Sequence, residues 1–284
     1  MSLSKFILIT AAFVSSVASA AEIKAIKITK DLSKLTAFED SIWKGAREES
    51  ISLMAQPMAN PRPKTTTTQL VKVQAVHDGQ WIAFKLRWNA ESKNEAGKLG
   101  QFSDAVALQF PVKEGPPPPV FMGAKDHPVH IFHWRAQYQR DHEKGKPEMT
   151  DLYPNMNPDM YPMEFKDPGH VEGLTEEKRE VYSPGKAAGN PQSYQKAGAV
   201  DEIFAEGFGS SSVIQNRMSV GQGTFKKGEW TVVIARPLKR ENGSVLEPGK
   251  GSYVAFAVWQ GSKQEVGSRK SVTMTWTPLQ VNGQ

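Results

Sequence analysis

The segment LVKVQAVHDGQWIAFKLRW, residues 70–88, decides the fold class. In its second half Ile82, Phe84, Leu86 and Trp88 alternate with residues of the opposite face, a pattern typical of a strand with one buried side. Asp78-Gly79 lies between the halves and is a dipeptide that readily supplies positive φ at both positions of a two-residue hairpin turn. The segment therefore predicts antiparallel strands over 70–77 and 81–88, joined at that turn.

Further runs of the same kind follow along the chain. The run 253–259 is apolar on both faces, which predicts a central strand. Residues 200–205 are the best candidate for a short helix. Many short strands with frequent turns predict a mainly β protein, an antiparallel β-sandwich with few short helices. The other expected strands cover 103–110, 128–134, 229–238 and 271–279, with turns at Lys227-Gly228 and Asn242-Gly243.

Between Arg135 and Gly221 the periodicity disappears, and Pro, Asn, Gly and charged residues take over. A structureless stretch of this length is uncommon inside a compact domain. We therefore expect a functional insertion at about 135–221 that wraps the sandwich or covers a partner. The remainder of 21–284 is expected to form a single β-sandwich domain.

Residues 1–20 have the pattern of a secretory signal peptide. Lys5 supplies a positive charge, residues 6–17 are apolar, and Ala18-Ser19-Ala20 gives a small-x-small cleavage site. The apolar stretch is too short for a good transmembrane anchor, and no later segment is long enough to span a bilayer. We expect cleavage before Ala21 and a periplasmic, soluble mature protein; an uncleaved anchor is the alternative.

The chain contains no cysteine, which limits its cofactors. Disulfides, cysteine-ligated iron–sulfur clusters, zinc thiolate sites and c-type haem attachment are excluded. A cofactor must therefore be held by His, Met, Lys, Tyr or carboxylates. The net charge of +5 falls to +4 when Lys5 is removed with the leader, and this modest value argues against nucleic-acid binding.

Lys270 lies in GSRKSVTMTWTPL, residues 267–279, which we expect to form a strand. Counting by two from it reaches Val272, Met274 and Trp276, so a charge shares the apolar face. A buried ammonium needs a partner or must lose its proton. Two hypotheses stay open from the pattern: Lys270 extends its amine to water, or a neutral amine binds a metal.

An ordered set of strings resembles a known family. FMG at 121–123 is followed by PVHIFHW, AAGNP, AEGFG, GEWTVVIARPL, VAFAVWQGS and GSRKSVTMTWTPL. Over roughly 70–279 the chain is similar to the haem b-binding gamma subunit of ethylbenzene dehydrogenase, in the type II DMSO reductase family. Related subunits accompany dimethyl sulfide dehydrogenase, selenate and chlorate reductases and nitrite oxidoreductase.

The resemblance implies an exported β-sandwich that holds one non-covalent haem b between axial Met and Lys ligands. On this chain the ligands would be Met122 and Lys270, with Lys186 and Lys196 as rival amine donors. It also implies a non-catalytic electron-transfer subunit in a heterotrimer with a molybdopterin catalytic subunit and an iron–sulfur subunit, and a soluble cytochrome or similar protein as external redox partner.

The chemistry of these two residues is consistent with such a site. A thioether favours ferrous iron, and a neutral amine completes a six-coordinate centre that transfers electrons. The stiff run Pro116 to Pro119 is expected to deliver Met122 in extended conformation. Met122 as a simple core residue is the alternative. No G-x-S-x-G, H-E-x-x-H, P-loop or dinucleotide motif is present.

Other clusters support competing hypotheses. Strand periodicity places His130 and His133 on opposite faces, so a joint site with His127 is not expected, although one histidine remains an alternative haem ligand. A methionine-rich segment favours a periplasmic copper-binding protein, since thioethers bind Cu(I). Seven tryptophans favour a carbohydrate-binding sandwich. The methionines are Met149, Met156, Met160 and Met163, and the tryptophans are Trp43, Trp81, Trp88, Trp134, Trp230, Trp259 and Trp276.

Overall fold

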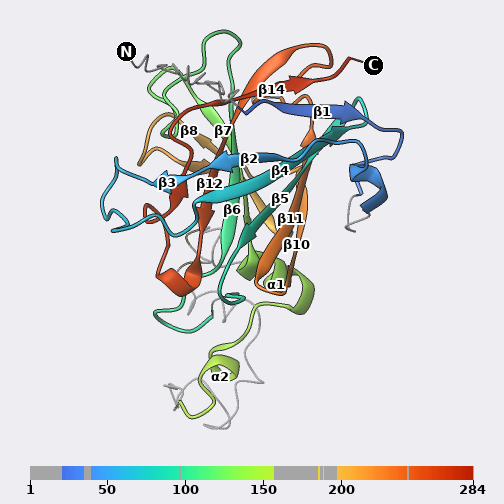
Figure 1. Cartoon of the computed structure of the whole chain (residues 1–284). Helices are drawn as coiled ribbons and strands as arrows, with labels where there is room; N and C mark the ends of the chain where they lie inside the picture. The colour runs from blue at the N-terminus through green and yellow to red at the C-terminus, as the bar shows by residue number, and fades with distance from the viewer. Residues whose placement is uncertain are drawn as a thin grey trace, which may run out of the picture.

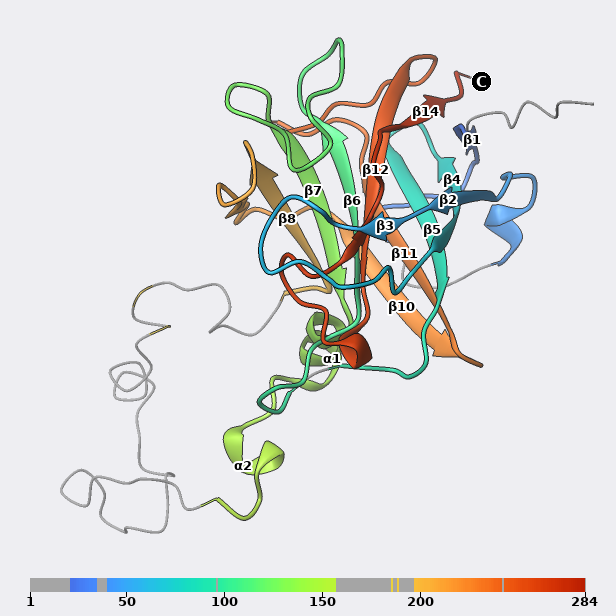
Figure 2. The ribbon, with the colours of Figure 1, turned by 60° about the vertical axis from the view of Figure 1, so that its left-hand side comes forward.

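Two β-layers face each other across an apolar core (Figures 1 and 2). The computed structural model describes residues 21–34, 40–95, 97–156, 185, 188, 197–241 and 243–283. Strand order along the hydrogen-bonded path is β10-β11-β5-β4-β1-β14-β12-β6-β7-β8-β9, with β2 beside β4 and with β13 between β12 and β3. Almost all pairings are antiparallel, and only β1 is parallel to its neighbours β4 and β14. The predicted mainly β sandwich is confirmed.

The strands and helices have the following bounds: β1 Ile23–Lys27, η1 Asp40–Trp43, β2 Glu49–Ser52, β3 Met54–Ala55, β4 Leu70–His77, β5 Trp81–Asn89, β6 Ala105–Pro111, β7 Val129–Arg135, α1 Ala136–Lys144, α2 Met149–Leu152, β8 Val200–Ala205, β9 Ser212–Val213, β10 Val220–Lys226, β11 Glu229–Pro237, β12 Gly251–Trp259, η4 Gly261–Lys263, β13 Ser271–Val272 and β14 Thr277–Val281.

The hairpin of β4 and β5 is confirmed, but its turn lies one residue later than expected. His77 pairs with Ile82, and the Asp78 N–H donates to the Trp81 carbonyl, so Gly79 and Gln80 are the central turn residues. Only Gly79 has positive φ, at 96°, which fits a turn with glycine at its first central position. The Asp78 carboxylate accepts hydrogen bonds from the N–H groups of Gln80 and Trp81 and fixes the turn.

The turn at Lys227-Gly228 is confirmed. Lys226 pairs with Glu229, which leaves these two residues as the loop between β10 and β11. Both have positive φ, 51° and 78°, the combination that the right-handed twist of a hairpin favours.

Strand β12 joins the two layers. Its first half pairs with β14, up to Val254 opposite Thr277, and its second half pairs with β6 from Ala255 opposite Gln109. The expected central position of this strand is therefore confirmed. Figure 2 shows β12 between the layer of β4, β5, β10 and β11 and the layer of β6, β7 and β8.

Three expectations are wrong. Residues 200–205 form β8, which pairs with β7, and not a helix. The range 135–221 is not irregular throughout, because it contains α1, α2, β8 and β9. Residues 271–279 do not form one strand, since β13 and β14 are separated by residues 273–276 and pair with different partners. Residues 1–20, and with them the expected signal peptide, lie outside the described residues.

The core between the layers is aromatic. Trp88 stacks on Trp230 at 6.2 Å between ring centroids, and the Trp134 ring packs edge-on against Trp230 at 5.1 Å. Gly223 in β10 makes room for this cluster, because a Cβ there would lie 2.3 Å from a Trp134 ring carbon. Within the described residues, no helix has the length and apolar character needed to cross a membrane.

Candidate functional site

A cavity of about 520 Å³ lies on the outer face of the second layer. Strand residues alternate in direction, so the even-numbered residues of β6, β7 and β12 enter the core while the odd-numbered ones face the cavity. Three of the cavity-facing residues are alanines, Ala107, Ala255 and Ala257. Because Ala107 pairs with Ala257 directly across the strands, the small side chains leave a low, apolar floor.

Irregular segments cover this floor from several parts of the chain. They include residues 56–60, 120–122, 208–211 and 267–270, the last of which leads into β13. In Figure 2 the segment around β3 crosses in front of β6 and β12. A mostly apolar cavity of this volume with a few polar groups is typical of a small-molecule or cofactor site.

Met122 lies in the cavity wall in a left-handed conformation, with φ at 65°. The expected extended delivery of this residue is wrong. Its carbonyl accepts a hydrogen bond from Gly207 N–H at 2.8 Å, and Gln109 Nε2 donates to Val120 O at 2.7 Å, so the loop is tied to β6 and to the segment that follows β8. A left-handed non-glycine residue costs about 1–3 kcal/mol, and such strain gathers at functional sites.

Lys270 lines the same cavity, immediately before β13 and not within a strand as expected. The expected face is only partly formed: Val272 also lines the cavity, whereas Met274 is 39% exposed. The Lys270 amine lies 4.9 Å from the centre of the Trp259 ring. Lys270 is half-buried as a whole, and desolvation of its amine lowers its pKa from 10.5 to about 8, which brings the neutral, metal-binding form of the amine closer to physiological pH.

The structure thus places Met122 and Lys270, far apart in sequence, around one cavity. Lys186 and Lys196 lie outside the described residues. Two further donors line the cavity: His133, one of the histidines kept as an alternative ligand, stacks on Trp259 at 4.6 Å, and Met58, which sequence reasoning missed, is 48% exposed. Apart from being a methionine, Met58 has no feature in the sequence that would predict a place at the cavity.

The histidine prediction is confirmed, since His130 and His133 lie on opposite faces of β7. His133 faces the cavity and His130 faces the core. Within the described residues, no group of three or more His, Asp or Glu is arranged to hold a metal ion. A joint three-histidine site is therefore not formed.

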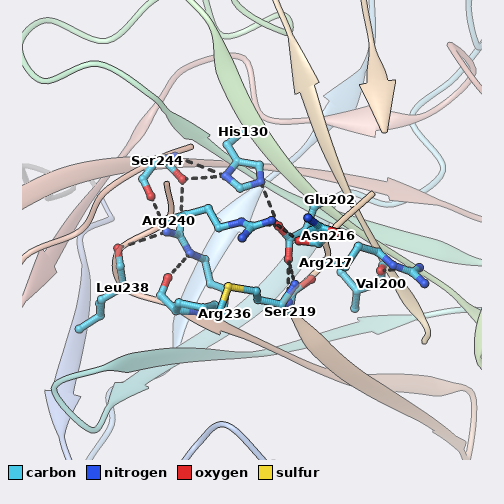
Figure 3. Close-up of polar contacts among 12 residues, drawn as sticks. His130, Val200, Glu202, Asn216, Arg217, Ser219, Arg236, Leu238, Arg240 and Ser244 are labelled. Atoms are coloured by element: carbon cyan, nitrogen blue, oxygen red, sulfur yellow. Dashed lines mark hydrogen bonds and ion pairs between the residues drawn. The ribbon is translucent and has the colours of Figure 1, made fainter. Parts of the chain in front are cut away.

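His130 instead belongs to a buried polar cluster between the layers (Figure 3). Its Nε2 lies 3.6 Å from Glu202 Oε2, and the Arg240 Nε donates to the same carboxylate oxygen at 3.1 Å. The other Glu202 oxygen accepts hydrogen bonds from Met218 and Ser219 N–H, each at 2.7 Å. The cluster therefore joins β7, β8 and two loops.

Burial and hydrogen bonding set the charges of this cluster. Burial acts to raise the pKa of Glu202, but the His130 ring 3.6 Å away and the hydrogen bonds from Ser219 and Met218 N–H outweigh it and lower this pKa to about 2. Burial also lowers the pKa of His130, which favours the neutral ring. It lowers the pKa of Arg236 to about 9, still above neutrality, and the guanidinium donates to Pro237 O and Ser244 O. The cluster holds its charges in place between the layers, although His130 Nε2 and the Ser219 hydroxyl make no hydrogen bond within it.

The tryptophans do not form exposed platforms. Five of the seven are buried and two, Trp81 and Trp276, are half-buried. This arrangement removes the main support for the carbohydrate-binding hypothesis. Of the methionines proposed for copper, Met160 and Met163 lie outside the described residues.

The chain is similar in sequence to subunits of two reductases. A chlorate reductase gamma subunit of Ideonella dechloratans is 25% identical over 244 residues, covering 84% of this chain and 77% of that protein. A protein of Haloferax mediterranei, whose name describes a respiratory nitrate reductase heme subunit, is 23% identical over 235 residues. This match covers 81% of the present chain but only 63% of the haloarchaeal protein.

A family 9 carbohydrate-binding module of Caldicellulosiruptor kristjanssonii, solved with glucose, is structurally similar at 7% identity and a TM-score of 0.43. This match covers 93% of the present chain and 97% of the module, and its score is too low to bear on function. The sequence pattern of the ethylbenzene dehydrogenase family, in contrast, matches residues 40–271. Because that match spans well over half of the sequence, the chain belongs to the ethylbenzene dehydrogenase family.

Proposed function

We propose that the chain is a haem-binding electron-transfer subunit of a reductase complex, with Met122 and Lys270 as the axial ligands of one haem b. One observation carries the proposal: a thioether and an amine of lowered pKa line the same cavity. The names of the two relatives, a gamma subunit and a heme subunit of reductases, point to the same role.

The residues around the cavity fit a haem. The alanine floor offers a low apolar surface to a flat ring, and Met122 and Lys270 supply a soft and a nitrogen donor. When bound, the haem supplies one-electron chemistry at iron. The chain would hold the ring, present the two donors and shield them from water, which supports electron transfer without a catalytic function of its own.

Met122 is favoured over Met58 because its backbone is left-handed and its carbonyl is held by Gly207 N–H, while Met58 is 48% exposed. Lys270 is favoured over His133 because its lowered pKa favours a neutral amine, whereas His133 Nδ1 lies 3.5 Å from Arg135 Nη2. These rivals define the variants that test the ligands.

The remaining expectations complete the proposal. Residues 1–20 direct export to the periplasm, and the mature chain assembles with an iron–sulfur subunit and a molybdopterin catalytic subunit. It relays electrons between the iron–sulfur subunit and an external partner such as a soluble cytochrome. A periplasmic copper-binding protein is the alternative.

The mature chain purified from the periplasm is expected to contain about one haem b per chain. Acid should extract this haem, because a chain without cysteine cannot attach it through thioether bonds. Pyridine haemochrome analysis measures its type and amount. Ala257→Phe, which fills the floor, is expected to lower the haem content while circular dichroism shows an unchanged fold. Stoichiometric copper without haem would contradict the proposal.

A further inference from the structure

The cavity-facing side of β7 changes from apolar to charged along the strand. Ile131, His133 and Arg135 are spaced by two, so they project to the same side, and all three line the cavity. Arg135 lies at the end of the strand, where the chain enters α1. One edge of the cavity is therefore cationic while its floor is apolar.

A smaller cavity of about 100 Å³ extends from this edge. It shares four lining residues with the large one: His133, Arg135, Trp259 and Gly267. Its volume is that of about three water molecules in the liquid, so it has room for a short side chain and not for a ring system.

The Arg135 guanidinium is positioned but has no anionic partner among the described residues. Its carbon lies 4.7 Å from the centre of the Tyr138 ring, and Nη2 lies 3.5 Å from His133 Nδ1. It forms no ion pair with a described residue, and no Asp or Glu is among the residues that line the larger cavity. A guanidinium carries five N–H donors and no acceptor, so beside its contact with the Tyr138 ring it is suited to bind an anion at the cavity edge.

One carboxylate, Glu265, lines the smaller cavity. It accepts hydrogen bonds from Gln260 N–H and the Thr67 hydroxyl, both at 2.8 Å. Burial raises its pKa, which favours the neutral form and weakens its repulsion of a second carboxylate. The smaller cavity is therefore compatible with an anionic guest beside Arg135.

We infer that Arg135 binds the propionate carboxylates of the haem and so fixes the orientation of the ring in the cavity. This inference rests on the proposed function. A haem carries its two carboxylates on one edge of an otherwise apolar macrocycle, which matches a cavity with an apolar floor and a cation at one edge. The smaller cavity accommodates the end of a propionate.

The test compares haem b with its dimethyl ester, in which both carboxylates are neutral. Each is titrated by absorbance into the apo form of the mature chain and of three variants. Arg135→Gln is expected to weaken haem binding by at least about tenfold, the usual worth of hydrogen bonds to a charged group, and to leave ester binding unchanged. Arg135→Lys is expected to retain part of the preference for the free acid.

Arg47→Gln is the matched control, because it makes the same exchange at an exposed arginine just before β2, in the other layer. It is expected to change neither affinity. Equal losses for haem and ester in Arg135→Gln would overturn the inference, since they would indicate lost packing. Unchanged haem binding in this variant would overturn it while leaving the proposed function intact. A wild-type chain that binds neither ligand would overturn both.

Discussion

Met122→Leu is expected to lower the reduction potential of the haem-loaded protein by on the order of 0.1 V, a fraction of the roughly 0.8 V that axial ligands span. Leucine keeps the volume and apolarity of the side chain, so the fold should persist. The thioether, which favours ferrous iron, would be lost. A spectroelectrochemical titration measures the potential, and thermal unfolding of the apo form checks that the fold is retained.

Met58→Leu is the matched control, because it makes the same exchange at the other methionine of the cavity. It is expected to leave the potential unchanged. A fall with Met58→Leu and none with Met122→Leu would transfer the ligand to Met58.

The nitrogen ligand is tested in the same titration. Lys270→Met is expected to raise the potential, since a second thioether further favours ferrous iron. Lys186→Met, Lys196→Met and His133→Leu are expected to leave the low-spin amine spectrum in place. Survival of that spectrum without Lys270, and its loss with one of the others, would reassign the ligand.

Glu202→Ala is expected to destabilise the chain by about 3–5 kcal/mol, the usual cost of removing one partner of a buried ion pair. The change leaves Arg240 without its carboxylate and Met218 and Ser219 without the acceptor of their N–H groups. Since domains are stable by about 5–15 kcal/mol, much of the stability would be lost. Urea unfolding monitored by tryptophan fluorescence measures the effect.

Glu247→Ala provides the comparison, because Glu247 pairs with Lys250 at the surface, where solvent screens the charges and such a pair contributes little. If both variants lost the same small amount, the buried cluster would not stabilise the fold. The folded fraction of Glu202→Ala should still bind haem, because the cluster and the cavity lie on opposite faces of β7.

The sequence was most informative where structure is local. The strands of 70–88 could be predicted because alternation and a glycine turn act over few residues. Strand β8 could not be predicted, since Asp201 and Glu202 look like solvent-exposed charges. They are buried in the fold only because Arg217 and Arg240, both distant in sequence, reach them.

The site shows the same limit. Met122 and Lys270 were reached through a family resemblance, and the cavity they share depends on strand register that no local pattern contains. The left-handed backbone of Met122 was missed because the preceding prolines favour extended chain. Arg135 was read as the beginning of an insertion, whereas it is the last residue of β7.

Strand β1 lies between β4 and β14, with Ile23 opposite Leu279 and Ala25 opposite Ala75. Residues separated by more than 250 positions must therefore meet before the path from β4 to β12 is continuous. Bringing such distant segments together costs the chain conformational entropy. We therefore expect β1 and β14 to pair slowly, and late in folding. A nascent chain without its final strand would expose the edges of both β1 and β12, a state that favours aggregation.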